Sequence, residues 1–169
     1  MKNAILFDFL VDKENKQIKV KRSFDGQLPL VWQAWTDAKI LDQWWGPHPW
    51  KARTSVMDFR EGGRWFYAMV GPSGETHWSL VNFKTIAHQK SFTTDCAFSN
   101  EKAEIIPDFP SNQWEIHFNG REDETVVDVT LSFEKLEHIE QMVQMGFKEG
   151  FTIGLEQLDE WLDQQKNKP

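Results

Sequence analysis

The sequence predicts an α+β fold, in which an antiparallel sheet with one dry face is joined to two short helices and a long C-terminal helix. Three observations predict this class. Residues 5–133 hold many short runs in which apolar and polar residues alternate, as in half-buried strands. The segment 28–45 instead repeats its apolar residues at helical spacing. After Phe133 the apolar period again becomes that of an amphipathic helix.

The first two strands are expected at 5–11 and 17–24, joined by the polar turn DKENK. Ile18 and Val20 lie on one side of the second run, and lysines lie on the other. Arg22 falls on the apolar side, where a charge needs a partner. Two interpretations stay open: Arg22 pairs with a carboxylate at the sheet edge, or it anchors the anionic head of a ligand.

Two short helices in tandem are expected over 28–45, LPLVWQAWTDAKILDQWW. Thr36 or Asp37 can cap the second one, because a short oxygen-bearing side chain accepts a hydrogen bond from a free backbone N–H group. Gly46 and Pro47 end this helix, since proline cannot continue the hydrogen-bond ladder.

From residue 54 to 133 the chain has strong β character. The turn signals EGG, GPSG, IPDFPSN and GREDE separate the runs TSVMDF, RWFYAMV, THWSLVNFK, QKSFTTDC, QWEIHFN and TVVDVTLSF. Alternation is clearest over 114–118 and 127–133. Strands joined by such short turns form antiparallel hairpins, and the alternation indicates one buried face.

A long amphipathic helix closes the chain. Apolar residues from Phe147 to Leu162 fall on one stripe of a helix that ends near Gln165. Gly150 and Gly154 lie close to this stripe, where the helix should meet the sheet. They allow either a close approach of the backbone or empty space.

The composition excludes several classes of function. The net charge is −7, from 26 acidic and 19 basic residues, whereas proteins that bind nucleic acid or anionic membranes cluster Lys and Arg. Nine Trp and thirteen Phe stand against one Tyr. Large rigid rings in this number favour a wide core or a roomy pocket.

The single cysteine, Cys96, excludes a disulfide within the chain and any paired-cysteine zinc or redox motif, which suits a reducing compartment. The N-terminal residues form only a short apolar run followed by charges, which resembles neither a signal peptide nor a membrane span. We therefore expect one domain over residues 1–169 and a cytoplasmic location.

Motifs that carry chemistry are scarce. The histidines are scattered singly, so no metal site is expected, and neither EGGR nor GPSG has the spacing of a phosphate-binding loop. Cys96 follows Asp95, which would raise the pKa of its thiol, and no serine lies in a nucleophile elbow. We expect no catalytic residues, no metal and no cofactor.

A candidate pocket follows from strand parity. If GPSG is a four-residue hairpin loop, Val70 pairs with Glu75. This register places Tyr67 opposite Trp78 on one face. Asn82 shares the parity of Trp78 and is a second inward polar candidate. The candidate ligand-binding residues are Arg22, Trp45, Trp65, Tyr67, Met69, Trp78, Leu80, Phe92, Trp114, Phe147, Gly150, Phe151 and Gly154. The alternative is that these side chains only fill a core.

Three segments carry a family resemblance: VWQAWTDAKILDQWWGP, FREGGRWFYAMVGPSGE and GFTIGLEQLDEWL. In this order they resemble the signature segments of the activator of heat-shock protein 90 ATPase homologue family, within the START-like (SRPBCC) superfamily, over about residues 17–163. The resemblance implies the helix-grip fold, a curved antiparallel sheet of about six or seven strands wrapped around the last helix. It also implies a cavity between sheet and helix.

The family pattern also bears on LDQWWGPHPW, residues 41–50, which is unusually rich in tryptophan. In the family, the WWGP segment ends the second short helix and leads into the sheet. One interpretation is a wedge that packs against the end of the sheet. The other is a lid, in which Trp45, His48 and Trp50 lie at the mouth of the cavity.

Binding of a small, mostly apolar ligand in this cavity is the favoured function. The first alternative is a stress-related, co-chaperone-like protein that acts through its surface. It ranks lower because eukaryotic co-chaperone members carry a separate N-terminal domain, whereas this chain begins shortly before the first matching strand. The second alternative is a cyclase- or hydrolase-like enzyme, which has few inward polar groups to use. We expect a monomer or homodimer.

Overall fold

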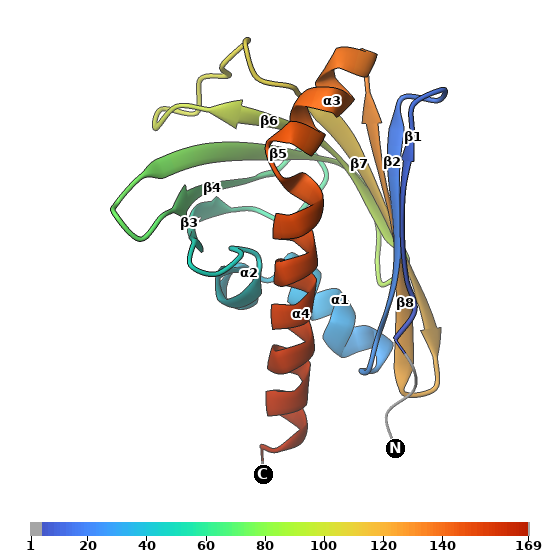
Figure 1. Ribbon diagram of the computed structural model, residues 1–169. Coiled ribbons are helices and arrows are strands. Elements are labelled where there is room, and N and C mark those ends of the chain that lie inside the picture. Colours follow the sequence, from blue (N-terminus) through green and yellow to red (C-terminus); the bar gives the residue numbers. More distant parts are fainter. Residues whose placement is uncertain (1–4, 169) are drawn as a thin grey trace.

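The computed structural model describes residues 5–168, which form one antiparallel sheet of eight strands and four helices (Figure 1). In chain order the elements are β1 (Phe7–Asp12), β2 (Gln17–Phe24), α1 (Leu28–Thr36), α2 (Ala38–Trp44), β3 (Lys51–Met57), β4 (Arg64–Val70), β5 (Thr76–Ala87), β6 (Ser91–Ser99), β7 (Asn112–Arg121), β8 (Glu124–Phe133), α3 (Leu136–Gln144) and α4 (Phe147–Lys166). This is the α+β helix-grip arrangement that the sequence predicts.

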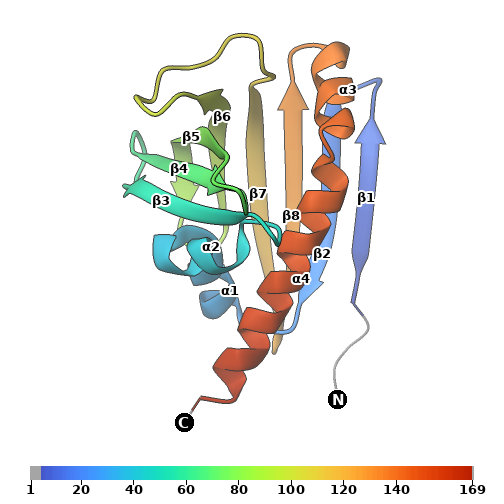
Figure 2. The ribbon, with the colours of Figure 1, turned by 60° about the vertical axis from the view of Figure 1, so that its left-hand side comes forward.

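The strand order is β1-β2-β8-β7-β6-β5-β4-β3, and every neighbouring pair is antiparallel. Among these pairs, β2 with β8 joins strands that are distant in sequence. The sheet has eight strands, against about six or seven expected. Strands β3 to β6 turn away from the direction of β1, β2, β7 and β8, and the sheet thereby curves around α4 (Figures 1 and 2). Its concave face is the dry face.

The core lies between this concave face and the helices. Alternate residues of β2, β7 and β8 point inward, and α4 contributes its apolar stripe. The most deeply buried members include Ile18, Val20, Val127, Leu131, Trp44, Leu155, Leu158 and Leu162. Removal of this apolar area from water supplies the main free energy that holds α4 on the sheet.

The tandem helices form as predicted, and their boundary identifies the cap. The Asp37 side chain accepts a hydrogen bond from the Lys39 N–H at 2.9 Å, whereas the Thr36 hydroxyl donates back to the Trp32 carbonyl. Asp37 is therefore the N-cap of α2.

The chain between β8 and α4 contains a helix that the sequence pattern did not separate. Helix α3 buries Ile139 and Met142, and it ends just before Gly146. Gly146 adopts φ +83°, a left-handed conformation that glycine tolerates best, and α4 starts at the next residue. The helical C-terminal region is therefore two helices.

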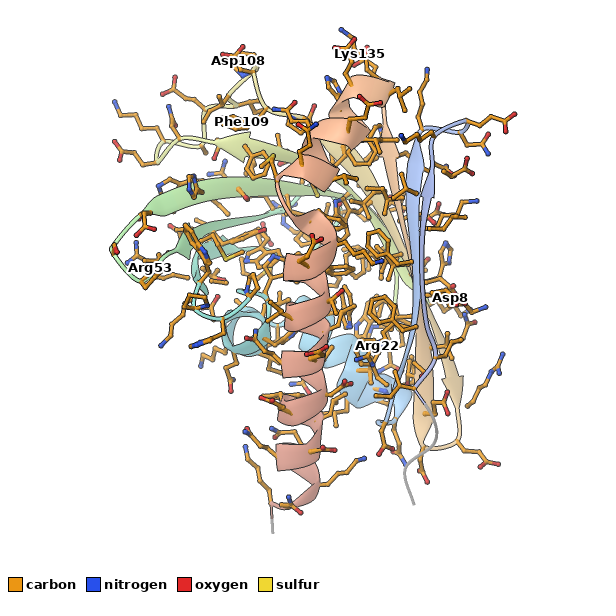
Figure 3. The ribbon with its side chains drawn as sticks, viewed as in Figure 1. Asp8, Arg22, Arg53, Asp108, Phe109 and Lys135 are labelled. Carbon is orange, nitrogen blue, oxygen red and sulfur yellow. The ribbon has the colours of Figure 1, made fainter. Side chains whose placement is uncertain are left out.

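Arg22 is buried on the concave face and lies between β2 and α4 (Figure 3). Its guanidinium makes a two-point ion pair with Asp159, in which one nitrogen donates at 3.1 Å and also donates to the Ser23 carbonyl at 2.7 Å. The guanidinium carbon lies 4.9 Å from the centre of the Phe24 ring. Arg22 therefore pairs with a carboxylate, as one interpretation expected, but the carboxylate comes from α4 and not from the sheet edge.

Replacement of Arg22 by Met should lower the free energy of unfolding by about 2 kcal/mol, because it leaves a half-buried Asp159 unpaired. Urea denaturation measures this loss. The double variant Arg22→Met/Asp159→Leu should recover part of it, because no unpaired charge remains. A double variant that is less stable than the single one would contradict this account of the ion pair.

Candidate functional site

The register of the β4–β5 hairpin, which shapes part of the concave face, differs by one residue from the predicted register. The Gly71 N–H donates to the Glu75 carbonyl at 2.8 Å, so the loop holds three residues and Val70 pairs with Thr76 rather than with Glu75. Gly74, with φ +88°, supplies the left-handed position of such a loop. Because side chains alternate along a strand, this slip moves the β5 side chains before the bulge at Phe83/Thr85 to the opposite face.

Three predicted inward residues are therefore corrected. Trp78 and Leu80 lie on the convex face, where the Trp78 ring stacks on Phe66 with centres 4.8 Å apart. Asn82 has the same parity and is exposed. In their place, Ser79 and Val81 point to the concave face, opposite Tyr67 and Trp65.

The other predicted strand residues do meet on the concave face. They are Trp65, Tyr67, Met69, Phe92 and Trp114. Phe147 and Phe151 of α4 face them, with ring centres 6.1 and 5.8 Å from that of Trp114. The sheet and α4 thus present one continuous aromatic surface.

The Trp45 indole occupies the space between this sheet surface and α4. Its ring centre lies 5.5 Å from that of Trp65, 5.8 Å from Trp114 and 6.1 Å from Phe151. The preceding Trp44 is fully buried and donates to the Ala34 carbonyl, whereas Trp45 keeps partial exposure. The paired tryptophans therefore differ: Trp44 is a wedge in the core, and Trp45 covers the concave face.

A hydrogen bond also links Trp45 to the sheet. Its Nε1–H donates to the Tyr67 hydroxyl at 2.9 Å. Burial raises the pKa of Tyr67 to about 12, although hydrogen bonds from Trp45 and Ser79 act in the opposite direction. Tyr67 is therefore neutral over the physiological range.

A strip of partly exposed side chains continues from Tyr67 across the concave face. Cross-strand pairing places Ser79 beside Phe98, Val81 beside Cys96, and Cys96 beside Asn112. Ser79, Cys96, Phe98 and Asn112, which we call the concave strip, are all half-buried. The sequence does not identify these four as site residues, because they become neighbours only through the observed register.

Polar groups at the concave strip carry no charge. The pKa of the Cys96 thiol is raised, first by burial and also by the nearby Asp95 carboxylate. The Cys96 sulfur and the Thr94 hydroxyl are hydrogen-bonded at 3.2 Å. The strip therefore joins apolar surface to neutral hydrogen-bonding groups.

The two glycines of α4 face the loop after α2 rather than the sheet. A Cβ on Gly154 would lie 3.3 Å from the Trp44 carbonyl oxygen, so this glycine permits close approach of the backbone. A Cβ on Gly150 would meet Pro47 at 3.5 Å, an ordinary contact. Their place in the fold is to let the WWGP segment lie against α4.

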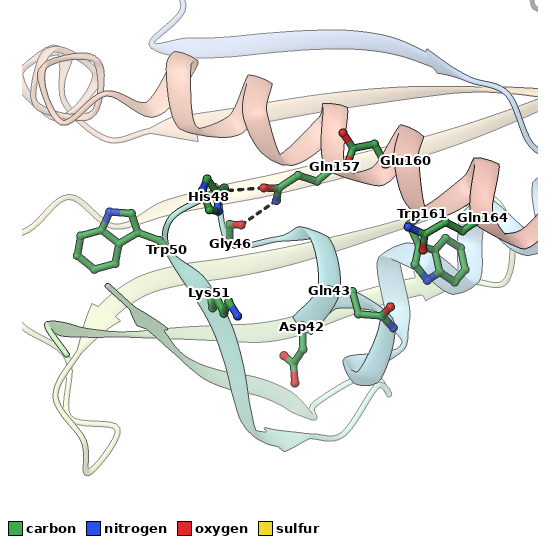
Figure 4. A pocket seen from close by; sticks show the side chains of 10 residues that line it. All are labelled: Asp42, Gln43, Gly46, His48, Trp50, Lys51, Gln157, Glu160, Trp161 and Gln164. Atoms are coloured by element: carbon green, nitrogen blue, oxygen red, sulfur yellow. Dashed lines mark hydrogen bonds between the residues drawn. The ribbon is translucent and has the colours of Figure 1, made fainter. Parts of the chain in front are cut away.

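The Gln157 side chain fastens that segment to α4. Its Nε2 donates to the carbonyls of Trp44 at 2.9 Å and Gly46 at 2.8 Å, and its Oε1 accepts from the His48 N–H at 3.0 Å. One amide thus satisfies three backbone groups at the end of α2, where helical carbonyls lack partners. We call this arrangement the Gln157 clamp (Figure 4).

A groove of about 410 Å³ lies on the other side of the Gln157 clamp, between the α2–β3 segment and α4 (Figure 4). It is lined by Asp42, Gln43, Gly46, His48, Trp50, Lys51, Gln157, Glu160, Trp161 and Gln164. These walls are mainly polar, unlike the concave strip. His48 is exposed here, and the Trp50 ring lies 5.6 Å from that of His77, so neither residue joins Trp45 in the aromatic cluster.

Within residues 5–168, no three His, Cys, Asp or Glu side chains lie close enough together to hold a metal ion. Across the same residues, no helix has the length and apolar character needed to span a membrane.

The profile of the family described as "Activator of Hsp90 ATPase homolog 1-like protein" matches residues 27–163. A comparison with curated proteins found no match. A solution structure of a protein from Arthrobacter aurescens is 27% identical, with a TM-score of 0.88, and the match covers 93% of this chain and 91% of that one. A crystal structure of a protein from Mycobacterium smegmatis is 24% identical, with a TM-score of 0.86, and the match covers 94% of this chain and 97% of that one. The crystal structure of the AHSA1 protein from Silicibacter pomeroyi is 17% identical, with a TM-score of 0.70, and the match covers 88% of this chain and 99% of that one.

Replacement of Gln157 by Leu should lower the free energy of unfolding by about 2 kcal/mol, because three backbone groups lose their partner. Gln164→Leu, on the same helix and in the same groove but exposed, is the matched control and should change stability by less than about 0.5 kcal/mol. Thermal and urea denaturation measure both. Equal losses in the two variants would contradict a special role for Gln157.

Alkaline pH should destabilise the fold through Tyr67. Its pKa rises from 10.0 to about 12 on folding, so the folded state retains a proton that the unfolded state releases. The stability is fully present below pH 10.0 and falls as the pH rises toward about 12. Tyr67→Phe should flatten this fall relative to wild type in urea titrations at stepped pH. Identical slopes for the two proteins would refute the assignment.

Proposed function

The chain belongs to the activator of Hsp90 ATPase homolog 1-like family, and on this premise we propose that it binds a small, mostly apolar molecule on the concave face of its sheet. Membership of a family supports the fold and not a particular ligand, because one fold hosts many activities. The proposal therefore depends on the side chains between the sheet and α4.

The observation that most supports the proposed binding site is the concave strip beside Trp45. Inward positions of a sheet that is covered by helices are normally sealed, yet Ser79, Cys96, Phe98 and Asn112 keep partial exposure. They adjoin Trp45 through Tyr67. A partly exposed strip of polar groups beside aromatic side chains supports a small-molecule site, because such sites combine apolar contact with a few polar groups.

In this proposal Trp45 acts as a lid over the binding surface. It is half-buried, it comes from the segment that follows α2, and one side-chain hydrogen bond joins it to the sheet. A ligand that enters from the concave strip would stack against the Trp45 ring or displace it. Displacement would uncover Trp65, Trp114 and Phe151, three residues of the predicted pocket.

The charge state of the site favours binding over acid–base catalysis. The pKa values of Tyr67 and Cys96 are both raised, so the phenol and the thiol stay protonated near neutral pH. A general base needs a pKa near the working pH, and a cysteine nucleophile needs its thiolate. These neutral groups are suited to orienting a ligand through hydrogen bonds.

A matched pair of substitutions on β6 tests the proposal. Cys96 points to the concave face and its neighbour Ala97 points to the convex face, and both are half-buried. Cys96→Phe should weaken binding of the neutral fluorophore N-phenyl-1-naphthylamine by at least about tenfold, because the added ring fills the concave strip. Ala97→Phe should leave its affinity unchanged.

Fluorescence titration measures both affinities, and circular dichroism confirms that each variant is folded. Native mass spectrometry of freshly purified protein gives an independent readout, since a retained molecule appears as a stoichiometric adduct. Absence of saturable fluorophore binding by the wild-type protein, or equal binding by the two variants, would overturn the proposed site.

A further inference from the structure

Asn112 carries an unused hydrogen-bond acceptor in the concave strip. It is the first residue of β7 and pairs with Cys96 on one side and Phe133 on the other, which places its side chain on the concave face. Its Oδ1 atom is buried and has no hydrogen-bond partner among the described residues. Buried amide oxygens nearly always have a partner, so this one requires an explanation.

The neighbouring polar groups do have partners. The Thr94 hydroxyl is bonded to the Cys96 sulfur, and Tyr67 accepts the Trp45 N–H. The unused acceptor therefore lies within the concave strip, whose side chains keep partial contact with solvent. A molecule that inserts between the side chains of the strip would reach the buried Asn112 oxygen.

The surroundings also determine the charge that such a molecule can carry. Arg22 is the cation on the concave face of the described strands. Asp159 and the Ser23 carbonyl engage its two terminal nitrogens, whereas its Nε has no partner among the described residues. An anionic group at the concave strip would face Asn112 and Cys96, neither of which supplies a positive charge. Burying an unpaired anion is strongly unfavourable, so the site disfavours carboxylates and phosphates.

We propose that the ligand is a neutral molecule with an aromatic or otherwise apolar body and a hydroxyl or N–H group that donates to Asn112 Oδ1. This inference rests on the proposed function, because it assigns the ligand class of the same site. Asn112 would set the chemical specificity, and the Trp and Phe rings would provide the apolar contact. The rings suit a flat aromatic body, since aromatic pairs favour stacked and edge-on contacts.

Three matched naphthalenes test the ligand class with the wild-type protein. Equilibrium dialysis at neutral pH would compare 2-naphthol, which donates a hydrogen bond, with 2-methoxynaphthalene, which only accepts one, and with the anion 2-naphthoate. We expect the alcohol to bind about tenfold more tightly than the ether, and the anion to bind most weakly.

Two asparagine variants localise the effect. Asn112→Leu should remove the preference for the alcohol and leave the affinity for the ether nearly unchanged. Asn82→Leu is the control, because Asn82 lies exposed on the convex face of β5. It should retain the wild-type preference. The wild-type ratio tests the ligand class by itself if Asn112→Leu does not fold.

The outcomes separate the two proposals. If 2-methoxynaphthalene binds wild type as tightly as 2-naphthol, the assignment of Asn112 as acceptor is wrong, while ligand binding on the concave face stands. Tightest binding of 2-naphthoate would likewise overturn the neutral class alone. If none of the three naphthalenes binds and N-phenyl-1-naphthylamine does not bind either, the proposed function itself fails.

Discussion

The hydrogen bonds from the Gln157 amide to the end of α2 are the constraint on which the site depends. A helix that ends inside a protein leaves carbonyl groups without partners, and burial of such groups is costly. Gln157 satisfies those of Trp44 and Gly46 and also binds the His48 N–H. Gly154 lets the backbones approach closely enough for this to happen. The segment that carries Trp45 is thereby held between α4 and the sheet.

The concave face keeps its buried charge in an ion pair and carries neutral polar groups elsewhere. Arg22 brings a charge onto the concave face, but it is paired with Asp159 of α4, whose side chain reaches solvent. Farther along the sheet, Tyr67, Thr94, Cys96 and Asn112 are neutral. The ion pair ties β2 to α4.

The two tryptophans of the tryptophan-rich segment have different places in the fold: Trp44 is the wedge that the sequence suggested, and Trp45 packs on the concave face. Trp44 is fully buried and bonded to the α1 backbone, so it fixes how α2 packs. Trp45 faces the aromatic surface of β4, β7 and α4 and stays partly exposed. Neighbouring residues at the end of a helix point in different directions, which allows one to anchor while the other covers a surface.

The sequence by itself determined the fold class, the tandem helices and most strands, because alternation and helical spacing are local and are enforced by burial of one face. It also showed that Arg22 needs a partner. Tertiary structure alone decided the partner, the β4–β5 register and the Gln157 clamp. Asp159 and Gln157 lie more than a hundred residues from the groups that they bind. A one-residue difference in a hairpin loop moved Trp78 and Leu80 outward and brought Ser79 inward, since side chains alternate between the faces of a strand.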